Sequence, residues 1–200
     1  MDRYPAPNRY DPHREAIPVS RPGMYTRRQI LLVGGALATA SISGCLADDE
    51  PTPEPVSIVG ATCDVCGMVI GDHFGPSAQA FYRGGTPPDG RNGPVRFDST
   101  AEAVTYHDDQ RSRGHELIVM YVVDYSRVSY EIEEMNDTLR ITAHPTRDAF
   151  VDAEGIYFVR DSDVFGSMGN DPIPFSDHED AKVFTNAYGG SVVQFDDLFE

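Results

Sequence analysis

The sequence predicts an α+β fold in which two related halves, each running strand–strand–helix–strand (ββαβ), follow an N-terminal export segment. Three observations support this prediction. The same order of aromatic, proline and helix-start motifs occurs twice, at residues 81–106 and 157–184. Each repeat ends in a glycine-containing turn and an apolar run. A chain of 200 residues with 40% hydrophobic content is long enough to bury one or two small cores.

The first half contains all four expected elements. Short strands are predicted at residues 81–83 and 94–97, where aromatic and β-branched residues are bounded by glycine and proline. Ser99 followed three positions later by Glu102 is a capping-box pattern, which predicts that a helix begins here. The uninterrupted apolar run at residues 117–123 predicts the last strand of this half.

The second half repeats this order. Residues 157–160 and 172–175 correspond to the two short strands, and Ser176 with Glu179 repeats the capping box. A final strand is expected at residues 191–195, directly after a pair of glycines. The Tyr and Phe side chains of both halves are expected to form the core.

The N-terminus predicts export and a lipid anchor. Arg27 and Arg28 precede an apolar run that is too short to span a bilayer, a pattern typical of a twin-arginine signal. The run ends in a sequence that resembles a lipobox, in which Cys45 becomes the lipid-modified first residue of the mature protein. Met24 is a second candidate start, because the residues before it are polar and contain proline. The expected location is the extracytoplasmic face of the cell membrane.

Five segments follow from these patterns. The residues after the signal are rich in Asp, Glu and Pro and are expected to form a flexible acidic tether. The stretch between the halves is polar and without clear periodicity, so it is expected to be a connector. The expected boundaries are residues 1–44 for the N-terminal extension and signal, 45–55 for the tether, 56–124 for the first half, 125–148 for the connector and 149–200 for the second half.

The chain is strongly acidic. It carries 32 acidic against 16 basic residues, a formal net charge of −16, and Lys182 is its only lysine. Such a surface stays hydrated where salt screens charge strongly, which indicates a salt-loving source. The same charge makes nucleic acid and anionic membrane surfaces poor electrostatic partners.

Residues 63–68, with the sequence Cys-Asp-Val-Cys-Gly-Met, bring two thiols and a thioether into one short turn. Sulfur donors select soft metal ions, above all Cu(I), over magnesium, calcium or manganese. Structural zinc and iron–sulfur sites normally use four Cys or His ligands, and this chain has no second cysteine pair. Met168, in a glycine-flanked loop of the second half, is a further accessible sulfur donor, although this residue taken alone is better explained as one that fills a gap in the core.

Two other interpretations of the cysteine pair remain open. Cys63 and Cys66 could form a structural disulfide, or the redox pair of an extracytoplasmic thiol–disulfide oxidoreductase. Thioredoxin-like pairs open a helix near a βαβ unit, whereas residues 68–72 have the pattern of a short extended piece that ends in a turn. A copper site should lose Cu(I) binding when Met68 is replaced, whereas a disulfide or a redox pair should not depend on the methionines.

Together these motifs resemble the NosL family of exported copper-binding lipoproteins, which help to assemble nitrous-oxide reductase. The resemblance covers residues 63–200 and is strongest at the Cys-x-x-Cys-Gly-Met motif, at the glycine-flanked Met168 and at Pro174-Phe175. It implies a body of two ββαβ halves, Cu(I) as the bound metal, and delivery of copper to the catalytic copper cluster of the reductase.

The resemblance also implies a ligand set. Cys66 and Met68 match the Cys-Gly-Met motif of the family, Met168 matches its second-half methionine, and Cys63 is an additional candidate. Many members have a histidine directly after the second-half Met-Gly, where this chain has Asn170. If that histidine is a ligand, another donor must replace it here. The candidates are Cys63, His73, His144 and His178.

The sequence thus predicts a metallochaperone and not an enzyme. Copper is expected to pass to nitrous-oxide reductase, or to another copper enzyme, by exchange of ligands through shared intermediates. That exchange requires accessible donors, so the two halves are expected to meet around the metal. An acidic surface attracts cations in general, whereas copper specificity must come from sulfur.

Overall fold

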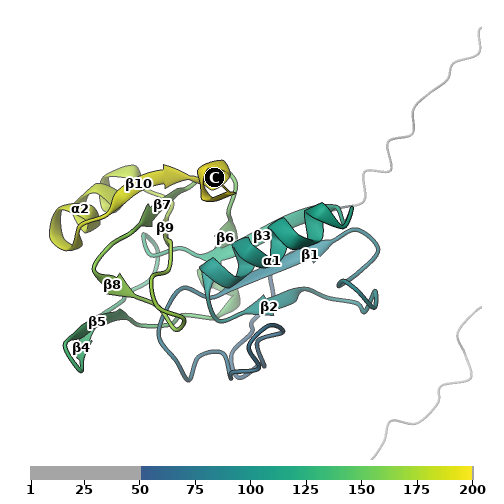
Figure 1. Ribbon diagram of the computed structural model, residues 1–200, viewed down its shortest axis with the longest axis horizontal. Coiled ribbons are helices and arrows are strands. Elements are labelled where there is room, and N and C mark those ends of the chain that lie inside the picture. The colour runs from purple at the N-terminus through teal and green to yellow at the C-terminus, as the bar shows by residue number, and fades with distance from the viewer. Residues whose placement is uncertain (1–50, 200) are drawn as a thin grey trace, which may run out of the picture. The chain divides into compact units, whose positions relative to one another are not determined.

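The computed structural model describes residues 51–199. A four-stranded antiparallel sheet in the order β2–β1–β3–β6 is its largest sheet. The strands are β1 (Ala78–Tyr82), β2 (Val95–Phe97), β3 (Leu117–Val123) and β6 (Phe150–Asp152). Helix α1 (Thr100–Ser112) lies along one face of this sheet, as Figure 1 shows. The predicted strand at residues 117–123 is therefore confirmed.

A second antiparallel sheet has the order β10–β7–β9 and packs against helix α2 (His178–Tyr188). Its strands are β7 (Tyr157–Arg160), β9 (Ile173–Phe175) and β10 (Ser191–Gln194). The two sheets share an arrangement of three strands: β1 lies between β2 and β3, and β7 lies between β9 and β10. The helix precedes the last of the three in each case, α1 before β3 and α2 before β10. The mixed α+β prediction is confirmed.

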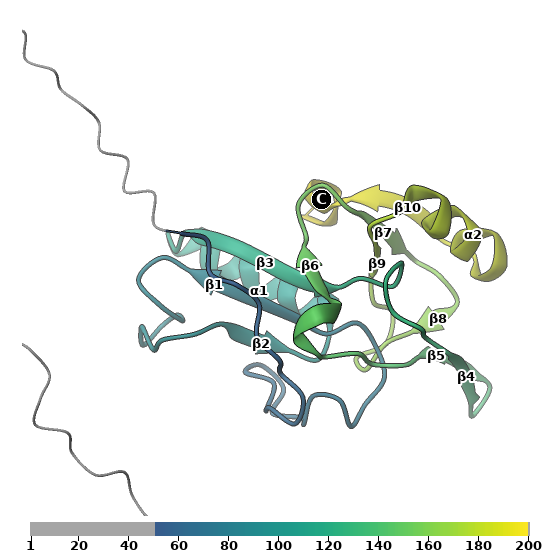
Figure 2. The same ribbon diagram turned by 180° about the vertical axis from the view of Figure 1, so that it is seen from behind.

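A third, small sheet includes a hairpin from the stretch that was expected to be a connector. It pairs the hairpin of β4 (Ile132–Met135) and β5 (Thr138–Ile141) with β8 (Val164–Phe165), and Figure 2 shows the hairpin at the edge of the body. Asn136 and Asp137 form the turn with φ of 52° and 60°. Asn and Asp tolerate this left-handed conformation, which a two-residue hairpin turn needs. The expected connector, residues 125–148, thus contains a β-hairpin.

Two short 3₁₀ helices complete the described elements: η1 (Arg147–Ala149) leads into β6, and η2 (Phe195–Phe199) follows β10. Among residues 51–199, no helix combines the length and the apolar character that crossing a bilayer requires. The expected signal and Cys45 lie outside the described residues. The last part of the expected tether contacts the body, because the carbonyl of Pro53 accepts a hydrogen bond of 2.9 Å from the Tyr121 hydroxyl.

The two halves share their cores. One buried cluster joins Cys63 and Ile70, from the cysteine segment, to Phe175 and Phe184 of the second half. The other joins residues of the first sheet to Phe158 of β7. Burial of a side chain as large as Phe contributes on the order of 1.5–3 kcal/mol, so neither half can lose the other without a large loss of stability.

The two predicted helix starts have different outcomes. Ser99 is the N-cap of α1, and its hydroxyl accepts from the backbone N–H of Glu102. The prediction that Ser176 caps the second helix was wrong. Asp177 is the N-cap instead, and its carboxylate accepts from the backbone N–H groups of Glu179 and Asp180. A carboxylate also interacts favourably with the positive end of the helix dipole.

Candidate metal centre

The cysteine segment folds into a closed loop. The backbone N–H of Cys63 donates to the carbonyl of Met68 at 2.8 Å, and Gly67 N–H donates back to the carbonyl of Cys63 at 3.1 Å. Gly67 has φ of 78°, a conformation that side chains disfavour, so glycine is required between the second cysteine and the methionine. This tight turn keeps Cys63, Cys66 and Met68 within one loop.

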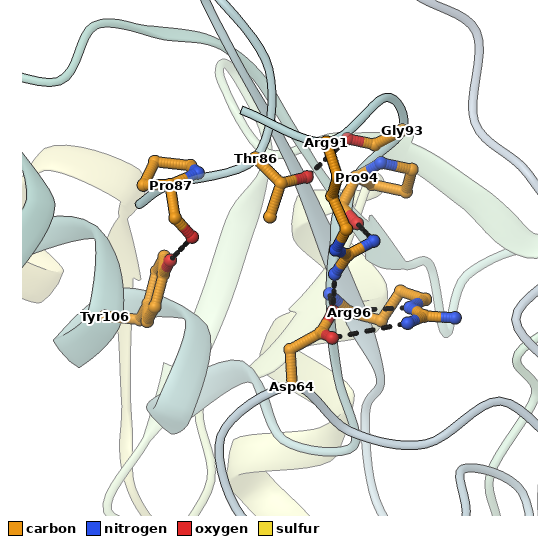
Figure 3. Close-up of polar contacts among 8 residues, drawn as sticks. All are labelled: Asp64, Thr86, Pro87, Arg91, Gly93, Pro94, Arg96 and Tyr106. Carbon is orange, nitrogen blue, oxygen red and sulfur yellow. Dashed lines mark hydrogen bonds and ion pairs between the residues drawn. The ribbon is translucent and has the colours of Figure 1, made fainter. Parts of the chain in front are cut away.

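Asp64 holds this loop against the first sheet. Its carboxylate accepts from Arg96 and pairs with Arg91 at 2.7 Å, while its own N–H donates to the Arg96 carbonyl at 2.8 Å. Figure 3 shows the carboxylate between the two guanidinium groups. Burial raises the pKa of Asp64, but the hydrogen bonds and charge of Arg96, with the charge of Arg91, outweigh it and hold that pKa below its usual value. The loop is therefore pinned by an ionised carboxylate.

Tyr106 of α1 borders the same region. Its hydroxyl donates to the carbonyl of Pro87 at 3.0 Å, and the hydroxyl of Thr86 donates to the carbonyl of Gly93 at 2.7 Å, as Figure 3 also shows. These bonds fix the segment that carries Arg91. These bonds thus help to hold Arg91 where it pairs with Asp64.

Four potential metal donors meet beside the loop. The sulfur atoms of Cys63 and Cys66 and carboxylate oxygens of Asp98 and Glu102 all lie within 4.8 Å of one another. Cys63 Sγ is 3.2 Å from Glu102 Oε2, and Cys66 Sγ is 3.4 Å from Asp98 Oδ1. Both cysteines are free thiols, so the thiol of each donates to its carboxylate. The structure brings the two predicted cysteines together with two carboxylates that the sequence analysis missed.

The positions of these carboxylates follow from the start of α1. Asp98 directly follows β2 and precedes the N-cap Ser99, and Glu102 lies in the first turn of the helix. The capping box predicted that Glu102 reaches back toward the helix start, but its carboxylate accepts from Cys63 instead. The acidic side chain of Glu102, near the end of β2 and the start of α1, was the sequence signal that could have indicated a metal ligand. It was missed because the capping box already explained a Glu at this position.

Burial controls the protonation of the thiols. It raises the pKa of Cys63 to about 12, and backbone hydrogen bonds only partly oppose it. Burial likewise raises the pKa of Cys66, and the neighbouring carboxylates of Asp98 and Glu102 add to the rise. Both groups are thus thiols and not thiolates near neutral pH. A metal ion that binds them must displace their protons.

The loop of Met168 docks beside this cluster. The hydroxyl of Ser167 donates to the Asp98 carbonyl at 2.9 Å, and Gly166 and Gly169 form a bridge that closes the loop. Gly75 contacts the same loop so closely that an added Cβ would lie 2.7 Å from the Cα of Gly166. Met168 itself is 51% exposed, so its side chain does not fill a gap in the core.

Asp171 joins the second half to the start of α1. It is fully buried, and its Oδ1 accepts from the Ser99 hydroxyl at 2.7 Å and from Ala101 N–H at 2.8 Å. Burial raises the pKa of Asp171 to about 7; the charges of Asp98 and Glu102 also raise it, while the two hydrogen bonds lower it. A residue three positions after Met168 thereby fixes the helix end that carries Glu102.

The structure places the three candidate histidines away from the cysteine cluster's donor group. His178 stacks on Tyr157, with ring centroids 4.5 Å apart, and His144 hydrogen-bonds Thr142 at 3.1 Å. His73 is exposed. Among residues 51–199, the donor group that includes Cys63 contains none of these histidines.

Comparison with known proteins gives consistent matches. The model of the NosL family matches residues 55–200. The chain is 28% identical over 165 residues to the copper-binding lipoprotein NosL of Stutzerimonas stutzeri, covering 81% of this chain and 76% of that protein. It is 28% identical over 177 residues to the protein of the same description from Achromobacter cycloclastes, covering 88% and 82%.

A solved structure is also similar. The crystal structure of the copper chaperone NosL from Shewanella denitrificans superposes with a TM-score of 0.58 at 25% identity. The match covers 73% of this chain and 95% of that chain.

Proposed function

The chain belongs to the NosL family, and from this premise we propose that it is a membrane-anchored Cu(I) metallochaperone for the assembly of the catalytic copper cluster of nitrous-oxide reductase. Matches to copper-binding NosL proteins and to a NosL copper chaperone support a copper-binding chaperone. The observation that carries the proposal is the pair of free thiols, Cys63 and Cys66, whose sulfur atoms lie within 4.8 Å of each other in one loop. Two adjacent soft donors suit Cu(I).

The proposed ligands are Cys66, Met68, Met168 and Cys63. Cys66 and Met68 are two positions apart in the closed loop, which supports their binding to one ion. Met168 belongs to the loop that docks on the carbonyl of Asp98, beside the thiols, and its exposure leaves the thioether available. These contacts support a site to which both halves contribute sulfur.

Transfer is proposed to occur by exchange of ligands. Cys63 is buried and would hold the ion from the protein side, whereas Cys66 is half-buried and Met168 is exposed. Donors of an acceptor protein can therefore approach from the side of Met168 and Cys66 and replace them one at a time. Copper is then never released into solution. Apart from metal–ligand bonds, the only bonds that change are the S–H bonds, whose protons the thiols lose to solvent on binding copper and regain on its release.

We also infer the location from the N-terminal sequence. Arg27 and Arg28 support twin-arginine export, and Cys45 supports a lipid anchor at the extracytoplasmic face of the membrane. The relatives from S. stutzeri and A. cycloclastes are described as lipoproteins, which agrees with such an anchor. The formal charge of −16 with a single lysine supports a salt-loving source.

A thiol–disulfide oxidoreductase is the alternative, because two free thiols lie close together. The attacking cysteine of such enzymes has a lowered pKa, which makes it a thiolate at working pH. Burial raises the pKa of both Cys63 and Cys66 here. Copper binding is therefore the better supported function.

The test is a Cu(I) titration of the full chain carrying Cys45→Ser, under reducing, high-salt conditions, in competition with a coloured Cu(I) chelator. The parent should withdraw one copper ion per chain. The variants Cys66→Ser, Met68→Leu and Met168→Leu should each compete less well. Met135→Leu is the matched control, since Met135 is 46% exposed in the β4–β5 hairpin. If the parent cannot compete with the chelator, the redox or structural alternative replaces the copper assignment. If only Cys66→Ser competes less well, the two methionines are not ligands and the proposed site fails.

The acceptor needs its own experiment. The copper-loaded chain is mixed with nitrous-oxide reductase that lacks its catalytic cluster, and the copper content and activity of the separated reductase are measured. Transfer from the parent, but not from a protein-free copper–chelator complex, supports the proposed acceptor. Transfer to a different copper enzyme alone would replace it.

A further inference from the structure

The sequence Asn136-Asp137-Thr138, in the β4–β5 hairpin, plays no part in the candidate metal centre. It has the pattern Asn-x-Ser/Thr with x not proline, and no other asparagine of the chain begins this pattern. In exported proteins the pattern is the acceptor sequence for N-linked glycosylation. Because so short a pattern also arises by chance, the position of Asn136 in the fold decides whether it can receive a glycan.

Asn136 lies at an exposed position. It is the first of the two turn residues, and Figure 2 shows the hairpin at the edge of the body. Asn136 and Asp137 are both exposed. The Thr138 hydroxyl is 3.5 Å from the backbone carbonyl oxygen of Asn136, and no residue from 51 to 199 forms a hydrogen bond with the Asn136 side chain. The amide nitrogen of that side chain is therefore accessible and not engaged elsewhere in the described body.

The hairpin can also open locally. Among the described strands, β4 is an edge strand that pairs only with β5. The pairing of β5 with β8 involves Leu139 and Arg140, so Met135 and Thr138 at the end of the hairpin pair only with each other. A segment with so few contacts opens at low cost. An enzyme can therefore draw the turn into its active site while the rest of the body stays folded.

We propose that Asn136 is an N-glycosylation site, modified after export by an oligosaccharyltransferase. The second substrate is an oligosaccharide carried on a polyprenyl phosphate in the membrane. The Nδ2 atom of Asn136 forms a bond to the anomeric carbon of the first sugar, as the bond from that carbon to the phosphate oxygen breaks. The polyprenyl phosphate leaves with the electron pair, and the amide gives up one proton to solvent. The inference rests on the proposed export and not on the copper function.

Export in the folded state makes the location of the acceptor decisive. The twin-arginine route carries proteins that are already folded, so glycosylation at the outer face of the membrane comes after folding. Only an acceptor at the surface can then react. An exposed turn in a hairpin at the edge of the body meets this requirement.

A glycan at this turn would also protect an edge strand. The free side of β4 presents backbone groups that can pair with another chain, and Met135 on this strand is 46% exposed. Glu133 and Glu134 oppose such pairing by charge, but salt screens repulsion between exposed charges. A hydrated glycan on Asn136, directly after β4, hinders the approach of another chain by its volume at any salt concentration.

The first test uses purified components. The full chain carrying Cys45→Ser, made in a host without N-glycosylation, is incubated in its folded state with an oligosaccharyltransferase and a polyprenyl-linked oligosaccharide. Intact mass spectrometry should show a gain of one glycan per chain, and tandem mass spectrometry of peptides should place it on Asn136. Asn136→Gln and Thr138→Ala should gain nothing, whereas Thr138→Ser, which keeps the hydroxyl, should still be modified.

Asn186→Gln is the matched control. Asn186 is likewise exposed, but it lies in α2 and is followed by Ala187 and Tyr188, so it lacks the pattern. This variant should be glycosylated like the parent. Circular dichroism of every variant checks that the body is folded during the reaction. Modification of the parent only after denaturation, or no modification at all, overturns the inference.

The second test separates the inference from the proposed location. The full chain with its own N-terminal sequence is produced in a host that has both twin-arginine export and N-glycosylation, and export is measured by digestion with protease added outside the cells. An exported chain with a glycan on Asn136 supports both. An exported chain without a glycan overturns the inference and leaves the proposed location standing. Retention inside the cell rejects the proposed location and the inference with it, while copper binding is decided by the chelator competition alone.

Discussion

The thiol of Cys63 donates a hydrogen bond of 3.2 Å to the carboxylate of Glu102, although the two residues are 39 positions apart in the chain. Glu102 belongs to the first turn of α1, so the start of this helix forms one wall of the candidate metal centre. The contact ties the chemistry of the cysteine loop to the way in which the helix begins. Changes at the helix start should therefore alter metal binding as well as stability.

Copper affinity should fall steeply as the pH falls. Burial raises the pKa of Cys63 to about 12 and also raises that of Cys66, so both are protonated near neutral pH. Ligation through both sulfur atoms releases two protons, and the apparent association constant should rise about 100-fold per pH unit. The check is a chelator competition over a pH series, with proton release followed in weak buffer. An affinity that does not change with pH would show that the thiols are not ligands.

Asp171→Asn should stabilise the protein increasingly as the pH rises from about 4 to about 7. Burial raises the pKa of Asp171 from 3.8 to about 7, so in this range the folded state holds a proton that the unfolded state has lost. The stability gained from this proton disappears as the pH passes the folded pKa. The advantage of the variant, which is neutral throughout, should approach an upper limit of about 4 kcal/mol.

The measurement for Asp171→Asn is chemical denaturation of parent and variant at about pH 5 and about pH 8. Asn keeps an oxygen that can accept from Ser99 and Ala101, so the variant should stay folded. Asp171→Ala, which leaves both donors without this acceptor, should be less stable than Asp171→Asn at either pH. The same stability difference between Asp171→Asn and parent at both pH values would contradict the raised pKa.

Asp64→Ala should loosen the cysteine loop. The variant removes an acceptor shared by Arg91 and Arg96, and the loss should cost about 1.5–3 kcal/mol of stability. Copper affinity should fall as well, because the two thiols lose their fixed separation. Asp109→Ala is the control: its ion pair with Arg113 is exposed on α1 and should cost less than about 1 kcal/mol. Equal effects of the two variants on copper binding would exclude a positioning role for Asp64.

Gly75→Ala should displace the loop of Met168. Its Cβ would lie 2.7 Å from the backbone of Gly166 and of Ser167, and φ of 105° adds strain. Gly84→Ala is the control for strain alone, since φ there is 80° but nothing lies within 4 Å of the added carbon. Both variants should lose stability, and only Gly75→Ala should weaken Cu(I) binding.

Combination with Met168→Leu tests the cause of that weakening. If Gly75→Ala acts by moving the thioether, it should weaken Cu(I) binding in the parent but have little further effect once Met168 is Leu. Full additivity of the two variants in the chelator competition would instead show that the loop affects the thiols directly.

Local patterns predicted much of this fold. The apolar run of β3 and the capping position of Ser99 are short-range features, and the structure contains both. The position of Cys63 near Cys66 is also local, because only two residues separate them and backbone hydrogen bonds close a tight turn there. The register of the sheets and the sharing of cores between halves depend on contacts between distant residues and had no local signature.

The missed features have particular physical causes. The hairpin turn at Asn136 and Asp137 is strongly marked in sequence, but the flanking strands are short and polar and show little periodicity. The site carboxylates were missed because their partners are distant: Asp98 meets Cys66 across 32 positions. A capping motif explained Glu102 without reference to any other part of the chain. Only the folded structure shows that its side chain points to a thiol.

The bond between Ser99 and Asp171 spans 72 positions of the chain. During synthesis, all four clustered donors, from Cys63 to Glu102, are made well before the residue that closes the helix end beside them. A shortened chain that ends before Asp171 would contain all four donors. It would lack the hydrogen bonds from Ser99 and Ala101 to Asp171, which hold the start of α1 in place. An export route that carries folded proteins would keep this incomplete stage inside the cell, and only the finished site would face the outside.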